Sequence, residues 1–358
     1  MNQNSDARPV DVKAIEVIAP NFKRRLSGVT STIIQLVPEQ ARRFGIATLG
    51  AGLPDSLPKM RWSQLPGVWL RPSSGKPRIW HARRNVEMLA GLVLRSLGAP
   101  LRLVFTSASQ RQHKGWTKFL IRRMDAVIAT SRKTSAYLEV PNTVVMHGVD
   151  TERFAPPPSR QAAIMAVGLN PDQHYVGCFG RVRHQKGTDL FVDAMIALLP
   201  SRPNWSAIVA GRATAEHLGF ERGLVEKVAK AGLSDRILFV GEHKDIPRWY
   251  QALSLFVAPQ RWEGFGLTPL EAMATGVASV AADVGAFSEL IEQDVTGTVI
   301  PADDLEAMKR ATAVYMDDPE KLAAQSQAAL ARARSEFPLS GEAARIAQVY
   351  EQVWAKAG

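Results

Sequence analysis

The chain has 358 residues, enough for two domains of ordinary size, and its 46% hydrophobic and 22% charged residues are typical of a globular protein. Cys178 is the only cysteine, which excludes an intrachain disulfide and a cysteine-based metal cluster. Because no run of about 18 apolar residues occurs and Met1 to Arg8 is polar, we expect neither a transmembrane helix nor an export signal, and we expect the chain to be cytoplasmic. The net charge of +10 comes from the first half: residues 1–160 carry 25 Lys or Arg and 10 Asp or Glu, whereas residues 161–358 carry 19 and 24.

Short apolar runs alternate with longer amphipathic segments along the first half, which is the pattern of strands and helices in a parallel sheet. Strands are predicted at residues 15–18, 46–49, 68–70, 78–80, 101–106, 126–129 and 143–146. Helices are predicted at residues 30–43, 83–97, 116–123 and 132–138. A linker follows at residues 151–158, because the three consecutive prolines at its end lack N–H donors and fix φ.

The second half repeats the alternation. Strands are predicted at residues 175–179, 206–210, 237–240, 255–258, 278–282 and 298–300, and helices at 188–199, 223–231, 268–275, 305–315, 320–335 and 341–356. The order predicts an α/β protein with two Rossmann-like domains, over residues 1–158 and 159–340, and a C-terminal helix over 341–358. A ligand is expected at the carboxyl ends of the second sheet.

The most informative motif places two carboxylates eight positions apart around a glycine turn. It follows a predicted strand and reads Glu263-Gly264-Phe265-Gly266-Leu267-Thr268-Pro269-Leu270-Glu271. A glycine loop that opens a helix presents free backbone N–H groups, which suit a phosphate. The two acids can reach opposite ends of one elongated ligand, such as a sugar nucleotide. Taken alone, however, each glutamate could be ordinary solvated surface.

A second motif ends the first strand of the second half. Gly180 lets the backbone approach a ligand closely, Arg181 offers a planar donor fork and Lys186 offers a point charge. This pair of cations suits a diphosphate. The alternative is that both are solvated loop charges.

Together the two motifs resemble the E-x7-E motif and the Gly-Arg…Lys-Gly stretch of the family 4 retaining glycosyltransferases. The resemblance implies the GT-B architecture, in which two Rossmann-like domains face each other across a cleft. The first would bind the acceptor and the second the nucleotide sugar, and the last helix would cross back onto the first domain.

The resemblance also implies roles for the motif residues. Arg181 and Lys186 would hold the donor phosphates and neutralise the leaving nucleotide, and Glu263 would bind hydroxyls of the donor sugar. Glu271 would accept hydrogen bonds from the ribose. The backbone N–H groups that would hold sugar and phosphate belong to Gly264, Phe265, Gly266, Leu267 and Thr268.

Asp245 lies where the family places the nucleotide base. A carboxylate there could accept from both guanine N–H donors, which would favour a GDP-sugar. The alternative is that Asp245 caps a helix, because Ile246 and Pro247 follow it.

In the first half, Gly28 falls in the loop that resembles the family loop over the donor phosphate. Many family members carry a histidine directly after the strand at 101–106, whereas this chain has Ser107 there. Gln110 or His113, slightly later, are the other candidates to replace it. At residues 146–150 the chain also departs from the family's Pro-Asn-Gly-Val-Asp, because Met146 replaces the proline and His147 the asparagine. We expect this departure to affect packing rather than chemistry.

Within the family, the chain looks most like the mannosyltransferases of the lipopolysaccharide inner core. These use GDP-mannose and a Kdo-containing lipid A precursor. The basic first half fits such an anionic acceptor and a peripheral contact with the cytoplasmic face of the inner membrane. A UDP- or ADP-sugar donor and another glycolipid or polysaccharide acceptor are alternatives.

No Asp-x-Asp pair occurs in the chain, so we expect no metal and no cofactor. The family retains the anomeric configuration, which implies same-face displacement with the leaving phosphate helping to deprotonate the acceptor. Two rival functions are a sugar-nucleotide epimerase and a basic protein that binds nucleic acid. The second lacks support, because no zinc-finger spacing or aromatic-rich RNA-binding signature accompanies the charge.

Overall fold

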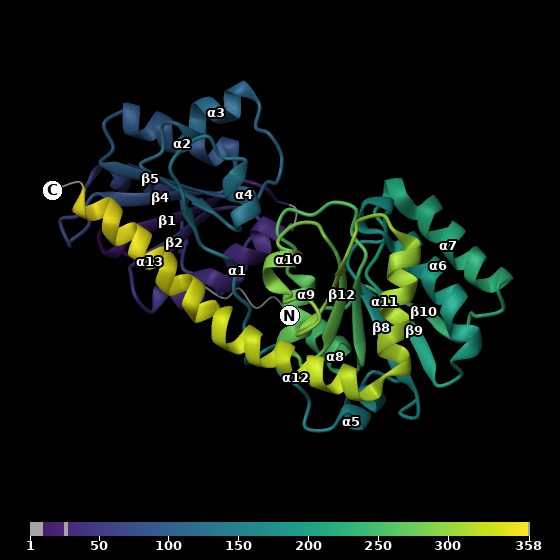
Figure 1. The fold of residues 1–358 in the computed structure, drawn as a ribbon. Helices are drawn as coiled ribbons and strands as arrows, with labels where there is room; N and C mark the ends of the chain where they lie inside the picture. The colour runs from purple at the N-terminus through teal and green to yellow at the C-terminus, as the bar shows by residue number, and fades with distance from the viewer. Residues whose placement is uncertain (1–9, 25–27, 357–358) are drawn as a thin grey trace, which may run out of the picture. The chain divides into compact units, whose positions relative to one another are not determined.

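The computed structural model describes residues 10–24 and 28–356, and the chain divides into two compact units (Figure 1). Unit 1 comprises Met1–His147 with Leu339–Gly358, and unit 2 comprises Gly148–Pro338. The boundary predicted after residue 158 falls inside unit 2, because the segment after His147 packs there. The Val149 N–H donates to the Phe337 carbonyl at 2.9 Å, and the Phe154 ring lies 5.9 Å from the Tyr250 ring.

Unit 1 is built on a seven-stranded parallel sheet with the order β3-β2-β1-β4-β5-β6-β7. Its strands are mostly buried on both faces, as apolar runs between crossover helices require, whereas the edge strand at residues 143–144 is exposed. They are β1 (Val17–Asn21), β2 (Ile46–Gly50), β3 (Lys59–Met60), β4 (Arg78–Ala82), β5 (Leu101–Ser107), β6 (Ala126–Ala129) and β7 (Thr143–Val144).

Helices cover both faces of this sheet. One face packs against α1 (Gly28–Ala41) and α13 (Leu339–Ala355), and the other against α2 (Asn85–Ser96) and α3 (Gly115–Ile121). The last helix is therefore part of the core of unit 1, and Figure 1 shows it in yellow beside α1. The shorter helices of unit 1 are η1 (Val12–Ala14), η2 (Trp62–Trp69) and α4 (Arg132–Ala136).

The strand predicted at residues 68–70 is wrong. The segment is the end of the 3-10 helix η2, which contains Pro66. Proline has no N–H to give to a sheet ladder, so the apolar run packs as a short helix that buries Val68. The other strands predicted in the first half are confirmed, although β1 begins at Val17 and β7 ends at Val144; the short strand β3 was not predicted.

Buried polar side chains tie the ends of unit 1 together. His147 pairs with Glu342 of α13, with 2.7 Å between Nδ1 and Oε1. His81 of β4 lies 2.6 Å from the Tyr350 hydroxyl and 2.7 Å from the Thr106 hydroxyl. Burial, followed by the charge of Arg83, holds the pKa of His81 well below 6.5, so this imidazole is neutral.

Unit 2 is built on a six-stranded parallel sheet with the order β10-β9-β8-β11-β12-β13. The strands are β8 (His174–Phe179), β9 (Trp205–Ala210), β10 (Ile237–Gly241), β11 (Leu255–Ala258), β12 (Ala278–Ala282) and β13 (Gly297–Ile300). The helices are α5 (Arg160–Ala166), η3 (His184–Lys186), α6 (Thr188–Leu198), η4 (Leu199–Ser201), η5 (Ala215–His217), α7 (Leu218–Lys230), α8 (Ile246–Gln251), α9 (Thr268–Ala274), α10 (Phe287–Leu290), α11 (Leu305–Asp317) and α12 (Pro319–Glu336).

The strands predicted in the second half are confirmed, and so is the helix start considered at Asp245, which is the beginning of α8; the short helices α5 and α10 were not predicted. In chain order, both sheets run outward from their first strand to the third and then resume on the other side of the first. The order reverses between β1 and β4 in unit 1 and between β8 and β11 in unit 2. This topological switch point is where open α/β sheets bind ligands, at the carboxyl ends of the strands. Among the described residues, no helix combines the length and apolar composition needed to cross a membrane.

Candidate active site

The switch point of unit 2 brings together two predicted site residues from loops far apart in the sequence. The loop after β8 carries Lys186 and the loop after β11 carries Glu263, and β8 and β11 are neighbours in the sheet. The Lys186 ammonium donates to Glu263 Oε2. The side chains are 20% and 19% exposed, so the pair remains accessible from solvent. An accessible ion pair at this edge can exchange its partners for an anionic, hydroxyl-rich ligand.

Two glycines shape the turn that carries Glu263. Gly266 has φ +87°, and a Cβ there would lie 2.2 Å from the Phe287 ring. Gly285 has φ +59°, and a Cβ there would lie 2.5 Å from the Phe265 carbonyl oxygen. Only glycine satisfies both the backbone conformation and the lack of room. The Glu263 carboxylate also accepts from the Gly264 N–H at 3.0 Å, which fixes its direction and occupies that donor.

Arg261 holds the Lys186 loop against the Glu263 loop. Its two terminal nitrogens donate to both oxygens of Asp189 at 2.8 and 2.9 Å, and its Nε donates to Asp303 at 2.7 Å. These hydrogen bonds, with that to Asp189 first, raise the pKa of Arg261. The sequence interpretation missed this residue, because only the fold reveals that its partners lie beside it.

Backbone contacts complete the link between the two loops. The Arg261 N–H donates to the Gln185 carbonyl at 3.0 Å, and its side chain donates to the His184 carbonyl at 2.6 Å. Gly187 has φ +68°, and a Cβ there would lie 1.9 Å from the Pro259 carbonyl oxygen. The loops therefore form one rigid platform under the ion pair.

Gly180 and Arg181 begin the same loop as Lys186. Both are exposed, and a Cβ added to Gly180 would meet no atom within 4 Å. The carbonyl side of Gly180 is crowded by Gly211. A Cβ added to Gly211 would lie 1.7 Å from the Gly180 carbonyl oxygen. The backbone of this loop thus presents an open face at the carboxyl edge of β8.

Glu271 lies within α9 and is not an ordinary surface glutamate. The Tyr250 hydroxyl donates to its Oε2 at 2.9 Å. Burial raises the pKa of Glu271, and burial followed by the Glu271 charge raises the pKa of Tyr250 well above 10. Tyr250 is itself held by aromatic neighbours, with its ring 4.7 Å from that of Phe179 and 5.5 Å from that of Phe256. The sequence interpretation did not single out Tyr250.

Asp245 occupies the N-cap position of α8, but its side chain makes no capping hydrogen bond. It pairs instead with Arg248 at 2.8 Å, and both side chains are exposed. A recess of about 290 Å³ lies beside this pair, where the His243 ring lies 4.4 Å from the Trp249 ring. The recess is lined by Ala166, Val167, His243, Lys244, Asp245, Arg248 and Trp249.

The site residues predicted in unit 1 each have different surroundings. Gly28 is the exposed first residue of α1, and residues 25–27 before it lie outside the described residues. Buried Ser107 accepts weakly from the Ser109 N–H at 3.4 Å, and Gln110 donates to Ser131 at 3.3 Å. His113 is half-buried, its pKa is lowered by burial and then by Arg111 and Lys118, and its Nε2 has no partner among the described residues.

The switch point of unit 1 holds a polar network that the sequence interpretation missed. Arg84 donates to Asn21 at 2.8 Å, to Glu87 at 2.7 Å and to Thr30 at 3.1 Å. Glu87 is fully buried and also accepts from the Arg83 N–H at 2.8 Å. These groups satisfy one another, so the network serves the structure of unit 1.

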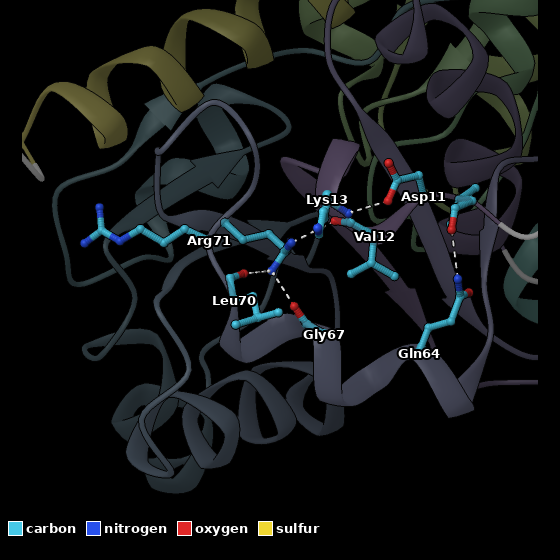
Figure 2. A pocket seen from close by; sticks show the side chains of 9 residues that line it. Asp11, Val12, Lys13, Gln64, Gly67, Leu70 and Arg71 are labelled. Atoms are coloured by element: carbon cyan, nitrogen blue, oxygen red, sulfur yellow. Dashed lines mark hydrogen bonds between the residues drawn. The ribbon is translucent and has the colours of Figure 1, made fainter.

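A recess of about 410 Å³ lies at the amino edge of the unit 1 sheet (Figure 2). It is lined in part by Arg78, the first residue of β4. The Arg78 guanidinium donates to the carbonyls of Val12, Ile15, Val68 and Leu70 at 2.7–3.1 Å. Burial lowers the pKa of this arginine. Because its donors are spent on backbone carbonyls, Arg78 joins segments of the fold and does not offer a binding group.

Comparisons with known proteins agree with this geometry. Residues 159–332, which include the loops after β8 and β11, match the family model "Glycosyl transferases group 1". The chain is 66% identical over 349 residues to the lipopolysaccharide core biosynthesis mannosyltransferase LpsB of Rhizobium meliloti, covering 96% of this chain and 99% of LpsB. The chain belongs to the group 1 glycosyltransferases. The mannosyltransferase LpcC of Rhizobium leguminosarum bv. viciae is 57% identical over 345 residues, covering 96% of this chain and 98% of LpcC.

Solved structures of glycosyltransferases have the same fold. The crystal structure of Anabaena Alr3699/HepE in complex with UDP matches 94% of this chain and all of that chain, with a TM-score of 0.81 and 21% identity. The C-terminal domain of a group 1 glycosyltransferase (LpcC) from Francisella tularensis is 34% identical, covers 53% of this chain and 99% of that chain, and has a TM-score of 0.51. The predicted family and the predicted architecture of two Rossmann-like domains are therefore confirmed, and this group 1 member is an enzyme that transfers a glycosyl group.

Proposed function

We propose that this glycosyltransferase moves mannose from GDP-mannose onto an anionic lipopolysaccharide-core acceptor of the Kdo-lipid A type. The observation that carries the proposal is the accessible Lys186–Glu263 pair at the switch point of unit 2, in a chain 66% identical to a mannosyltransferase of lipopolysaccharide core biosynthesis. A diphosphate and a sugar are the two ligand parts that would use this cation and this carboxylate.

Donor binding would exchange the partners of this ion pair. A diphosphate offers the Lys186 ammonium several anionic oxygens, and Arg181 in the same loop adds a planar fork. Once Lys186 turns to the diphosphate, the Glu263 carboxylate is free to accept from sugar hydroxyls. The two side chains thus hold each other in place before the donor binds, and they separate to bind its two halves.

The nucleoside would be read by two further carboxylates of unit 2. Tyr250 holds Oε2 of Glu271, so a ribose hydroxyl would donate to Oε1 of the same carboxylate. Asp245 would accept from the two guanine N–H donors in place of Arg248, beside the recess that contains Trp249. Both roles use the carboxylate as a pure acceptor.

The transfer step would rest on positioning and charge stabilisation. Arg181 and Lys186 would stabilise the charge that develops on the leaving diphosphate, with no metal required. The acceptor hydroxyl would attack the anomeric carbon from the face that the diphosphate leaves, and its proton would pass to a phosphate oxygen. The configuration of the sugar is then retained.

The acceptor would bind to unit 1, which carries the positive charge of the chain. Residues 1–160 hold 25 Lys or Arg against 10 Asp or Glu, which complements an acceptor rich in carboxylate and phosphate. Ser107, Gln110 and His113 are the acceptor-side candidates. Such a glycolipid acceptor would bring the enzyme to the cytoplasmic face of the inner membrane.

A thermal-shift panel of GDP, UDP and ADP with their mannose and glucose conjugates tests the donor. UDP and its sugar belong in the panel because Anabaena HepE was solved with UDP and UDP-glucose. We expect GDP-mannose to give the largest rise in Tm and Lys186→Ala to lose it. Lys227→Ala, which breaks a Lys–Asp pair between α7 and α6, is the matched control. A response to UDP-glucose alone would refute the mannose donor.

A further inference from the structure

An apolar stripe runs along the solvent side of α2 in unit 1. Val86, Leu89, Val93 and Leu97 follow one another at spacings of three, four and four residues, and they are 40–64% exposed. This spacing places them on one face of the helix, and the other side of α2 already buries Met88 against the sheet. The helix is thus apolar on both sides, whereas the outer side of a surface helix is ordinarily polar.

The neighbouring helix α3 also exposes apolar side chains. Asn85 at the start of α2 donates to the Thr117 hydroxyl of α3 at 2.8 Å, and Figure 1 shows the two helices side by side. Trp116 and Phe119 of α3 are 53% and 42% exposed. Their rings stack on each other with centroids 5.4 Å apart and an interplanar angle of 14°.

The other end of the stripe meets η2. The Trp69 indole donates to the Leu97 carbonyl at 2.8 Å, and Leu70, next to it, is 62% exposed. We define the apolar surface as the α2 stripe together with the exposed residues of α3 and of the η2 end. Its members are Val86, Leu89, Val93, Leu97, Trp116, Phe119, Trp69 and Leu70.

Cations outnumber acids in the segment that carries most of the apolar surface. Residues 85–139 contain nine Lys or Arg and three acids. Glu87 is buried and paired with Arg84, and the other two acids, Asp125 and Glu139, pair with Arg95, Arg102, Lys118 and Arg122. The Arg123 guanidinium lies 3.4 Å from the centre of the Phe119 ring, and Lys114 is exposed beside Trp116. A partner that covers the apolar residues must therefore be electrostatically compatible with the Lys and Arg side chains around them.

We propose that the apolar surface docks unit 1 on an anionic lipid bilayer. Aliphatic side chains on one helical face, tryptophans at both ends and Lys or Arg around them are the features by which helices lie in a membrane interface. The anionic leaflet supplies the charge complementarity that the surface requires. The inference deepens the proposed function, because an acceptor anchored in the membrane is reached by an enzyme held at the same interface.

Vesicle sedimentation tests the docking directly. We expect the full-length protein to bind vesicles of phosphatidylglycerol and phosphatidylethanolamine, to bind phosphatidylcholine vesicles far less, and to lose affinity as salt is raised. Trp116→Ser with Phe119→Ser, and separately Leu89→Ser with Val93→Ser, should each weaken binding by about tenfold, because each pair removes apolar area from the contact.

The matched control removes equally exposed apolar residues elsewhere. Leu218 and Val225 of α7 in unit 2 are 47% and 44% exposed, so Leu218→Ser with Val225→Ser loses similar side chains. We expect this variant to bind vesicles like the native protein. Equal losses in the control and test variants, or no vesicle binding by the native protein, would overturn the proposal. If the native protein is a dimer and only the variant Trp116→Ser with Phe119→Ser (the α3 variant) loses the dimer, the surface binds a second copy of the chain. That result would also overturn the proposal.

A fluorescent probe locates the contact, and a transfer assay separates docking from catalysis. Cys178 is buried and its thiol pKa is raised to about 12, so Leu89→Cys offers the reactive thiol for an environment-sensitive dye. Its emission should shift to the blue on anionic vesicles, whereas dye at Val225→Cys should not shift. Transfer to a detergent-dispersed acceptor should persist in the α3 variant. If the native protein transfers no sugar, the proposed function is refuted. If the emission of the dye at Leu89→Cys does not shift on anionic vesicles, the docking is refuted.

Discussion

The two units share one strand order but fill its switch point differently. In unit 1, Arg84 at the N-cap of α2 donates to Asn21, Thr30 and Glu87, and Glu87 is fully buried. In unit 2, the pair between Lys186 and Glu263 is about one-fifth exposed. Both places bring together a cation and a carboxylate, so topology alone does not distinguish them.

The difference lies in whether the polar groups are satisfied by the fold. A buried network that satisfies its own members fixes a structure, because removing one partner leaves an uncompensated charge. An accessible pair on a rigid platform can change partners, which is what a ligand site needs. The switch point of unit 1 therefore supports the fold, and that of unit 2 is the candidate active site.

The largest expected effect is on catalysis in unit 2. Glu263→Ala and Lys186→Ala should each lower kcat/KM by at least about a thousandfold, because each removes a charge aimed at the reacting groups. Steady-state transfer of labelled sugar measures the loss, with circular dichroism to show that the fold is kept. Near-native turnover in either variant would remove the distinction between the two switch points.

The second effect is on the stability of unit 1. Arg84→Ala leaves the buried Glu87 carboxylate without its ion-pair partner and should lower the free energy of unfolding by about 3 kcal/mol. Urea unfolding followed by tryptophan fluorescence measures the change. Arg122→Ala breaks an exposed pair with Glu139 and should cost about 0.5 kcal/mol or less. Similar costs for the two variants would show that the network is not structural.

The third effect concerns the platform under the Lys186–Glu263 pair. Arg261→Lys keeps the charge but cannot hold both oxygens of Asp189 together with Asp303, so kcat should fall by about ten- to a hundredfold through misplacement of the loop. Donor affinity measured by calorimetry should change less than kcat. Asp303→Asn, at an exposed partner, is the milder control. An unchanged kcat in Arg261→Lys would show that the loops hold their places without this arginine.

The smallest effect is a dependence of stability on pH in unit 2. Burial raises the pKa of Glu271, so the folded state binds a proton more readily than the unfolded state. This contribution to stability is complete below the unfolded pKa and is lost as the pH rises through the folded pKa. At neutral pH, Glu271→Gln should therefore raise Tm by about 2 °C while keeping an acceptor for Tyr250. The gain should vanish near pH 4, and a lower Tm at neutral pH would contradict this assignment.

Local patterns predicted the parallel strands because most of them are short apolar runs buried on both faces. β8, β11 and β12 lie close to their predicted positions for this reason. The strand predicted at residues 68–70 was wrong because Pro66, just before it, has no N–H to donate to a sheet. The segment ends the 3-10 helix η2 instead. Short helices such as α10 escaped prediction because four residues carry too little periodicity.

The sequence by itself determined the family and the two motifs that contain Arg181, Lys186, Glu263 and Glu271, because a glycine turn with fixed charges is a local property of the chain. Only the tertiary structure decided which residues support them. Arg261 gains its partners from three different segments, and Tyr250 meets Glu271 from another helix. Contacts between distant segments depend on how strands are ordered in a sheet, and no local pattern in the chain encodes that order.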